Sequence, residues 1–224
     1  KQTYWPSVLT GGLIGLSYSG FTASTILSGH TAFAFFSIIS LSTAGRWLSE
    51  NDRKWLFYSA ATGGIAFATI EYAILLPLSI FIATLLKLKS NANICWKLIA
   101  IDALTWALTA VASLLVVWPA GVIKFSILKN YIVSAYMVLM RNHVFQSDNS
   151  IVSAWIERIV SDPLTYWIII IGLLWSIPVL LKQVKLYPMI IFALLLFLTT
   201  MKNTSTSPTY VIALLGVTIC LSAI

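Results

Sequence analysis

The chain has 224 residues, of which 59% are hydrophobic and only 9% are charged, and its mean hydropathy is +0.91. This composition leaves too few polar residues to cover a water-soluble globule, so we expect lipid to surround most of the chain. The net charge of +7 comes from basic residues in short clusters between apolar runs. Such clusters are typical of membrane topology and not of nucleic-acid binding. The two cysteines, Cys95 and Cys220, are too few for a disulfide framework or a metal site.

Eight apolar segments are long enough to cross, or nearly cross, a bilayer core about 30 Å thick as helices. We therefore predict an all-α, polytopic membrane helix bundle in which residues 1–224 form a single transmembrane domain. The third and fourth segments, broken at Glu71-Tyr72, are short enough to form a tight hairpin of half-length helices. In chain order the segments are Val8–Ser28, His30–Trp47, Trp55–Ile70, Ala73–Leu86, Leu98–Trp118, Leu164–Leu181, Leu186–Met201 and Thr209–Ile224.

The orientation follows from the basic residues, because cytoplasmic loops retain Lys and Arg. With the N-terminus inside, nine of the 14 basic residues fall in the cytoplasm and five fall outside. The nine are Lys1, Arg46, Arg53, Lys54, Lys87, Lys89, Lys97, Lys182 and Lys185. The sequence thus predicts a multi-pass protein of a cell membrane, most simply a bacterial cytoplasmic membrane, with its active face outward.

The outer segment from Pro119 to Pro163 carries two helical patterns. Residues 122–140 are apolar but contain Lys124 and Lys129, and residues 151–160 place apolar side chains at intervals of about four. Both patterns favour interfacial helices that lie in the membrane surface. The alternative makes residues 125–140 a ninth span, but it would move the basic loop at 182–185 to the outside.

Glu71 and His30 are the first candidates for chemistry on the outward face. A carboxylate between two apolar runs, such as Glu71, is costly in lipid and usually faces a cavity or a partner. A solvated turn residue would give the same pattern, and both interpretations stay open. His30 follows Gly29 at a helix start, where it could donate to a phosphate or carry a proton. An interfacial histidine in a turn is the simpler alternative.

Cations in the outer segment could hold a lipid-linked phosphate through charge-assisted hydrogen bonds. Snorkelling side chains that anchor an interfacial helix would look the same. Asp102 lies near Lys97 in the fifth segment, so we expect it in an ion pair within or between helices. Walker, GxGxxG, HExxH and paired-Cys motifs do not occur, so nucleotide chemistry has no support. The candidates for donor binding are His30, Glu71, Tyr72, Lys124, Lys129, Arg141 and His143.

Four stretches, in their order and spacing, resemble the GT-C class of membrane glycosyltransferases, specifically family 39, which includes protein mannosyltransferases and the aminoarabinose transferase of lipid A. The resemblance covers nearly the whole chain. The stretches are Ser28–Phe36 running to Arg46-Trp47, Gly63–Thr69 ending at Glu71-Tyr72, Trp118–Gly121 through Leu128–Tyr131, and Ser207–Tyr210.

The resemblance implies transfer of a sugar from a polyprenyl-phosphate donor to an acceptor at the outer face. In that family the catalytic base is an acidic residue in the first outer loop, and no such unit precedes Tyr4 here. Thr209 also stands where the family often has Arg. We therefore expect an N-terminally truncated chain that binds the donor without transferring the sugar. The catalytic residue, the sugar, the acceptor, the oligomeric state and the use of a divalent metal stay open.

Two other classes of function remain to be weighed. A transporter or flippase of a lipid-linked substrate usually shows repeated halves with broken helices, and no repeat is visible apart from the break at Glu71. A structural membrane subunit would not gather His, Glu and Lys on one side. The sequence therefore favours the glycosyltransferase, with the transporter as the alternative.

Overall fold

The computed structural model describes residues 29–89, 96–119, 123–140, 151–164 and 183–201, together with single positions between 166 and 178. Every regular element in these ranges is a helix, which confirms the all-α prediction for the described part of the chain. The α-helices are α3 (Gly29–Glu50), α4 (Arg53–Thr69), α5 (Leu75–Lys89), α6 (Trp96–Val117), α8 (Phe125–Met140), α9 (Ile151–Ser161) and α11 (Tyr187–Met201). The short 3₁₀ helices are η1 (Glu71–Ile74) and η2 (Val184–Leu186).

The predicted segments 30–47, 55–70, 73–86, 98–118 and 186–201 correspond to α3, α4, α5, α6 and α11 within a few residues. Hydrophobic runs bounded by charged or polar residues were therefore sufficient to locate these helices. The first and last predicted spans lie outside the described residues. The segment 164–181 is described only at single positions.

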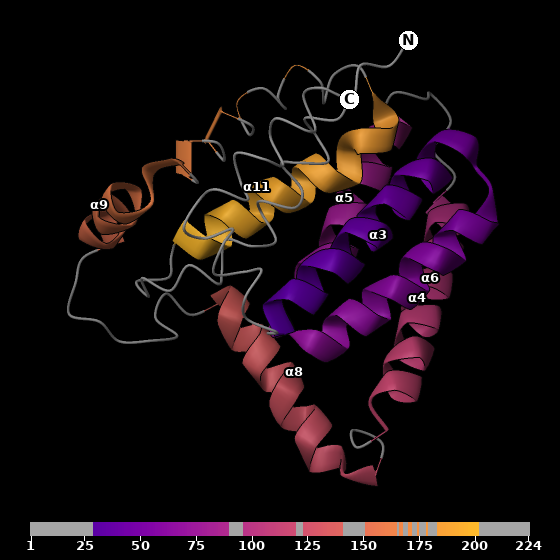
Figure 1. Cartoon of the computed structure of the whole chain (residues 1–224). Helices are drawn as coiled ribbons and strands as arrows, with labels where there is room; N and C mark the ends of the chain where they lie inside the picture. Colours follow the sequence, from indigo (N-terminus) through magenta and orange to yellow (C-terminus); the bar gives the residue numbers. More distant parts are fainter. Residues whose placement is uncertain are drawn as a thin grey trace.

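The α3–α4 hairpin is fixed by two capping residues. Asn51 has a φ of 56°, and its N–H donates to the Trp47 carbonyl at 2.9 Å, which is the left-handed C-terminal cap that asparagine tolerates. Asp52 then accepts a hydrogen bond from the Lys54 N–H at 3.0 Å and begins α4. Hydrogen bonds from the Lys54 ammonium and backbone lower the pKa of the Asp52 carboxyl. The two helices consequently run antiparallel, side by side (Figure 1).

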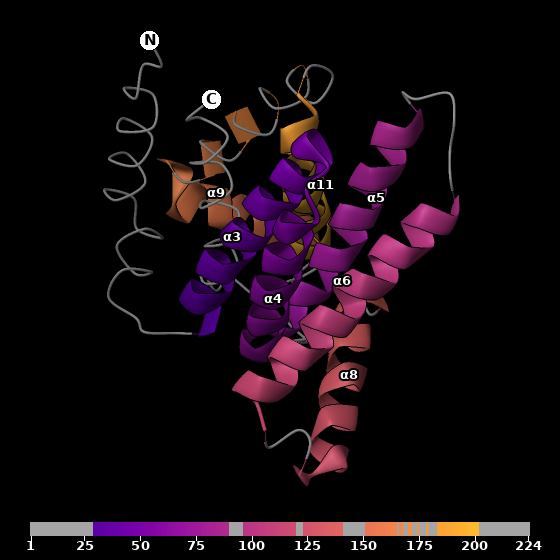
Figure 2. The same cartoon turned by 90° about the vertical axis from the view of Figure 1, so that its right-hand side faces the viewer.

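Two adjacent glycines let α4 and α6 approach closely. A β-carbon at Gly64 would overlap the backbone carbonyl of Ala110, and one at Gly63 would lie 2.7 Å from the Trp106 ring. Small residues at such a crossing allow backbone contact between helices. Figure 2 shows the result, with α6 crossing obliquely over α4 and separating from α5 toward its Trp96 end.

A buried hydrogen-bond network joins three helices at this crossing. The Ser40 hydroxyl of α3 donates to the Ser59 carbonyl of α4 at 2.8 Å. The Trp106 indole N–H of α6 donates to the Ser59 hydroxyl at 3.1 Å. Ser40 and Ser59 are fully buried, so each of these bonds is made away from water, where an unpaired polar group would be costly.

The tight hairpin expected on either side of Glu71 is wrong. The chain does break there, but α4 has 17 residues and α5 has 15, and the two helices choose different main partners. Helix α4 packs against α3 and α6, whereas α5 packs against α11 and α3. A buried cluster that includes Leu76 of α5 and Phe192 of α11 holds α5 in place. Packing of apolar faces therefore outweighed proximity along the chain.

Helix α6 is the one described helix that is both long and apolar enough to cross a membrane; the stretches 72–88 and 184–199 are apolar but shorter. Its 22 residues extend about 33 Å at 1.5 Å per residue. One side packs on α4 through Ile99, Trp106, Ala110 and Leu114. The other side is open, with Leu104 60%, Leu108 62% and Val116 81% exposed.

We predict that Gly64→Ala destabilises the chain more than Gly63→Ala. The added methyl at residue 64 meets the α6 backbone, which cannot move alone, whereas at residue 63 it meets a side chain that can rotate. Overpacking of this kind costs about 1–3 kcal/mol. Thermal unfolding in mild detergent, followed by circular dichroism, measures the difference. Equal stability of the two variants would contradict the close α4–α6 contact.

Candidate functional site

The starts and ends of several helices meet at one end of the bundle. A β-carbon at Gly29, the first residue of α3, would lie 3.0 Å from the Thr69 carbonyl oxygen at the end of α4. Helix α4 ends because Ile70 takes an extended conformation with φ −160° and ψ 148°. The Thr69 hydroxyl also bonds the Ala66 carbonyl at 2.6 Å in the last turn, a competition typical of helix ends. Glu71 then begins η1.

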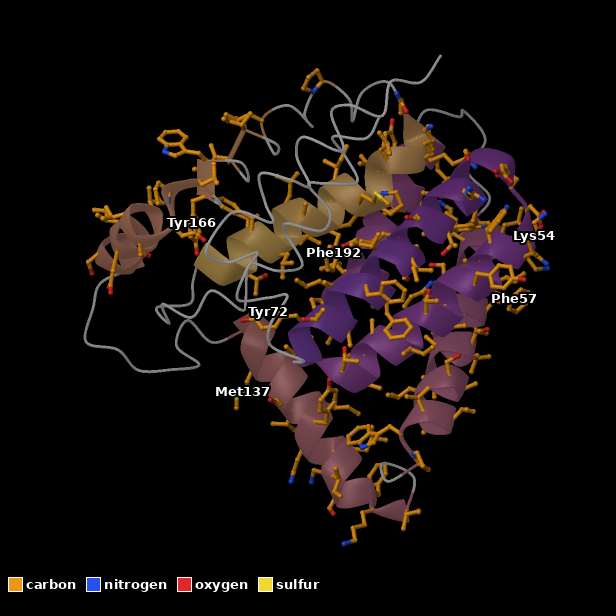
Figure 3. All side chains as sticks on the ribbon, in the orientation of Figure 1. Lys54, Phe57, Tyr72, Met137, Tyr166 and Phe192 are labelled. Carbon is orange, nitrogen blue, oxygen red and sulfur yellow. The ribbon has the colours of Figure 1, made fainter. Side chains whose placement is uncertain are left out.

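An aromatic cluster joins α8 to this end. The Tyr131 hydroxyl of α8 donates to the Phe67 carbonyl of α4 at 2.5 Å. The Tyr131 ring also makes T-shaped contacts with Phe67 and Trp118, each with ring centroids 5.3 Å apart. Figure 3 shows Tyr72 beside the C-terminal half of α8, marked by Met137, and at the opposite end of the α3–α4 hairpin from Lys54.

An apolar groove of about 330 Å³ opens below this aromatic cluster. Its walls come from α4, η1, α5, α6 and α8, and include Gly64, Phe67, Ile74, Leu114, Leu128 and Ile132. The lining contains no charged residue. Such a surface suits a hydrocarbon chain and offers nothing to a polar ligand. We call it the α4–α8 groove.

The structure describes the side chains of some predicted site residues and not of others. Lys124 precedes α8, and Lys129 lies in its second turn; both are exposed. Tyr72 is only 6% exposed and packs in the cluster that holds Phe33 and Phe192, so it supports the core and has little surface to offer a substrate. The side chains of His30 and Glu71, and residues Arg141 and His143, lie outside the described part of the chain.

The backbones of His30 and Glu71 nevertheless occupy the same end of the bundle, because Gly29 packs against Thr69. Helix α8, from the predicted outer segment, contacts η1 directly. One helix of the predicted outer segment therefore lies against the end that holds the His30 and Glu71 backbones. We predict that the His30 and Glu71 side chains line one pocket covered by the outer segment.

Asp102 forms the expected ion pair, and its partner is on another helix. Its carboxylate lies 3.4 Å from the Arg53 guanidinium at the start of α4. The pair is at the opposite end from Glu71, so Asp102 does not belong to the α4–α8 groove. Among the described residues, no three His, Cys, Asp or Glu side chains gather in a way that could hold a metal ion.

Sequence reasoning missed the role of Tyr131 and the groove beneath it. Tyr131 occurred in a stretch that carries the family resemblance, but its contact with Phe67 spans 64 positions in the chain. Neither periodicity nor charge indicates such a contact. A comparison with known protein families, with curated protein sequences and with solved structures finds no match to this chain.

We predict that Tyr131→Phe lowers stability by about 1 kcal/mol, because it removes one hydrogen bond and keeps the ring contacts. Tyr131→Ala loses the aromatic pairs as well, each worth about 0.5–1.5 kcal/mol, and should cost more. Tyr136→Phe is the control, since Tyr136 is an exposed residue of the same helix. Chemical unfolding of the three variants in detergent measures the order. A cost for Tyr136→Phe as large as that for Tyr131→Phe would count against a docked α8.

Proposed function

We propose that the chain is a polytopic membrane protein whose described helices α3 to α6 and α11 cross the bilayer. The exposed side of α6 supports this proposal most directly. It presents an apolar face about 33 Å long, slightly more than the bilayer core of about 30 Å. Only 17% of its most apolar stretch is buried in the structure, so α6 differs from the core helix of a soluble protein. A face of this size in water would be an aggregation site.

We propose further that the chain acts on a polyprenyl-phosphate sugar as part of a GT-C type glycosyltransferase, as the resemblance implies. The observation that carries this proposal is the α4–α8 groove. It lies beneath the end of the bundle that holds the backbones of His30 and Glu71, and α8 forms one wall. An isoprenoid tail in the groove would bring its phosphate to the level of that end. A soluble sugar nucleotide has no hydrocarbon chain that could occupy the uncharged α4–α8 groove.

We assign different tasks to the candidate donor-binding residues. Lys124 and Lys129 are exposed cations on or before α8, suited to a phosphate through charge-assisted hydrogen bonds, and Arg141 and His143 follow in the sequence. Glu71 and His30 are candidates for contacts with the donor near the sugar, and the acidic base that the resemblance implies is not among them. A transporter of a lipid-linked substrate would use the same groove, and the assay below separates the two.

We predict that the chain in lipid nanodiscs binds a polyprenyl-phosphate sugar, and binds the matching polyprenol without phosphate less tightly. Replacing Lys124 and Lys129 by Gln should weaken donor binding, because each cation near a phosphate is worth about 1 kcal/mol, or roughly fivefold. Lys54→Gln is the control, since Lys54 lies at the opposite end and pairs with Asp52. Titration calorimetry measures the affinities.

Equal binding of the donor and of the phosphate-free polyprenol would contradict the proposed site. Transfer of sugar to an acceptor, abolished by Glu71→Gln, would assign the catalytic base to Glu71. Movement of the intact donor between leaflets, without sugar transfer, would instead favour the transporter.

We predict that Cys95 faces the cytoplasm, because Lys87, Lys89 and Lys97 surround it in the sequence. In a Cys220→Ser background, a membrane-impermeant thiol reagent should spare Cys95 in intact cells and label it in inverted vesicles. A cysteine placed at Lys124 in a chain that lacks both native cysteines should show the opposite pattern. Labelling of Cys95 from outside would reverse the whole orientation.

A further inference from the structure

A second cavity lies at the other end of the cleft between α4, α5 and α6. It measures about 240 Å³ and is lined mainly by apolar side chains, among them Trp47, Leu56, Ile80, Phe81 and Trp106. Asp102 is the one charged residue in the lining. Pro77 and Trp106 line both this cavity and the α4–α8 groove, so they divide the cleft. We call the second space the basic-end cavity.

Cations from two helices stand at the mouth of this cavity. Lys87 of α5 follows the lining residue Thr84 by three positions, which puts it one turn further on the same side. Its ammonium donates to the Asn51 side-chain oxygen at 2.6 Å, in the α3–α4 turn. Arg53 precedes the lining residue Leu56 by the same spacing. Lys97 is a further exposed cation at this end of the bundle, in the first turn of α6.

The charges at this end of the bundle do not balance within the described part of the chain. Asp102 is the carboxylate that reaches Arg53, and Asp52 is engaged by Lys54 at 2.7 Å. Glu50 accepts the Trp55 indole N–H at 2.7 Å, and this neutral donor supplies no positive charge. Among the described residues, the cations at this end therefore outnumber the three carboxylates Glu50, Asp52 and Asp102; the cations are Arg46, Arg53, Lys54, Lys87, Lys89, Lys97 and Lys185. An anion at the mouth would be attracted by the excess positive charge.

We propose that the basic-end cavity binds an anionic phospholipid, with the phosphate between Lys87 and Arg53 and part of one acyl chain in the cavity. The inference depends on the membrane location proposed above but not on glycosyl transfer, because this site lies at the opposite end from the α4–α8 groove. A phospholipid matches both features of this site, because the cations suit its phosphate and the apolar lining suits its hydrocarbon chain.

The surroundings of the mouth fit a lipid better than a free phosphate. Exposed apolar side chains occur on the parts of α4, α5 and α6 near this end, namely Phe57, Leu86 and Leu98, and the lining residue Phe81 is itself exposed. A second acyl chain would lie along these side chains, in continuity with the bilayer. In addition, the predicted orientation puts this end at the cytoplasmic leaflet, where anionic lipids attract clusters of Lys and Arg.

Native mass spectrometry of the chain released from micelles that contain equal amounts of phosphatidylglycerol and phosphatidylcholine tests the proposal. We expect phosphatidylglycerol to be retained preferentially on the unmodified chain. Lys87→Gln should weaken this binding roughly fivefold, the share of one cation near a lipid phosphate. Lys54→Gln, at the same end but paired with Asp52, should leave it within about twofold. Inorganic phosphate should not displace the lipid.

Two further variants separate the polar and apolar halves of the site. Ala103→Phe should fill the cavity, whose lining includes Ala103, and reduce lipid retention while the cations remain. Arg53→Gln combined with Asp102→Asn removes the ion pair without leaving a lone charge, and it replaces Lys87→Gln if that variant does not fold. Three outcomes would each overturn the proposal. The unmodified chain could retain the two lipids equally, inorganic phosphate could displace the lipid, or Lys87→Gln and Lys54→Gln could have equal effects.

Discussion

The contact between α4 and α6 at Gly63 and Gly64 determines how the rest of the described structure is arranged. It brings the two backbones together where any larger residue would overlap Ala110 or Trp106. Ser40, Ser59 and Trp106 then close a buried hydrogen-bond network across α3, α4 and α6. Where no water is present, a lost packing contact or hydrogen bond is not replaced by a contact with solvent. Close packing and hydrogen bonding therefore stabilise this crossing together.

Helix α6 packs on α4, and it therefore diverges from α5. Helix α5 instead packs on α11, through the cluster that includes Leu76 and Phe192. The resulting cleft contains the α4–α8 groove near η1 and the basic-end cavity near the α3–α4 turn. Trp106 has two roles in this arrangement, since its indole N–H completes the buried network and its ring contributes to both cavities.

The two ends of the bundle differ in chemistry, and this difference underlies both proposals. The end near Glu71 combines aromatic rings with an uncharged groove, covered by α8 through Tyr131. The other end carries Arg46, Arg53, Lys87 and Lys185, with α3 touching the η2 backbone at Gly45. Arg46 lies over the Trp55 ring, 4.7 Å from its centroid, which keeps a cation beside an aromatic side chain, as is common at membrane surfaces.

The sequence by itself determined the helical class, the bounds of α3 to α6 and α11, and the grouping of basic residues at helix ends. These features depend on local composition, because a helix satisfies its own backbone and its ends are marked by charged or capping residues such as Asp52. The expected pairing of Asp102 was also correct, although its partner, Arg53, is 49 positions away in the chain and could not be named from spacing alone.

Only the tertiary structure decided which helices touch. The break at Glu71 suggested a hairpin of α4 and α5, yet Gly64 favours α6 and Leu76 favours the α11 face. Apolar side chains look alike in sequence whether they face lipid, a neighbouring helix or a cavity. Shape complementarity between distant segments makes that choice, and it creates the two cavities, the Tyr131 contact and the cationic mouth, none of which has a local signal.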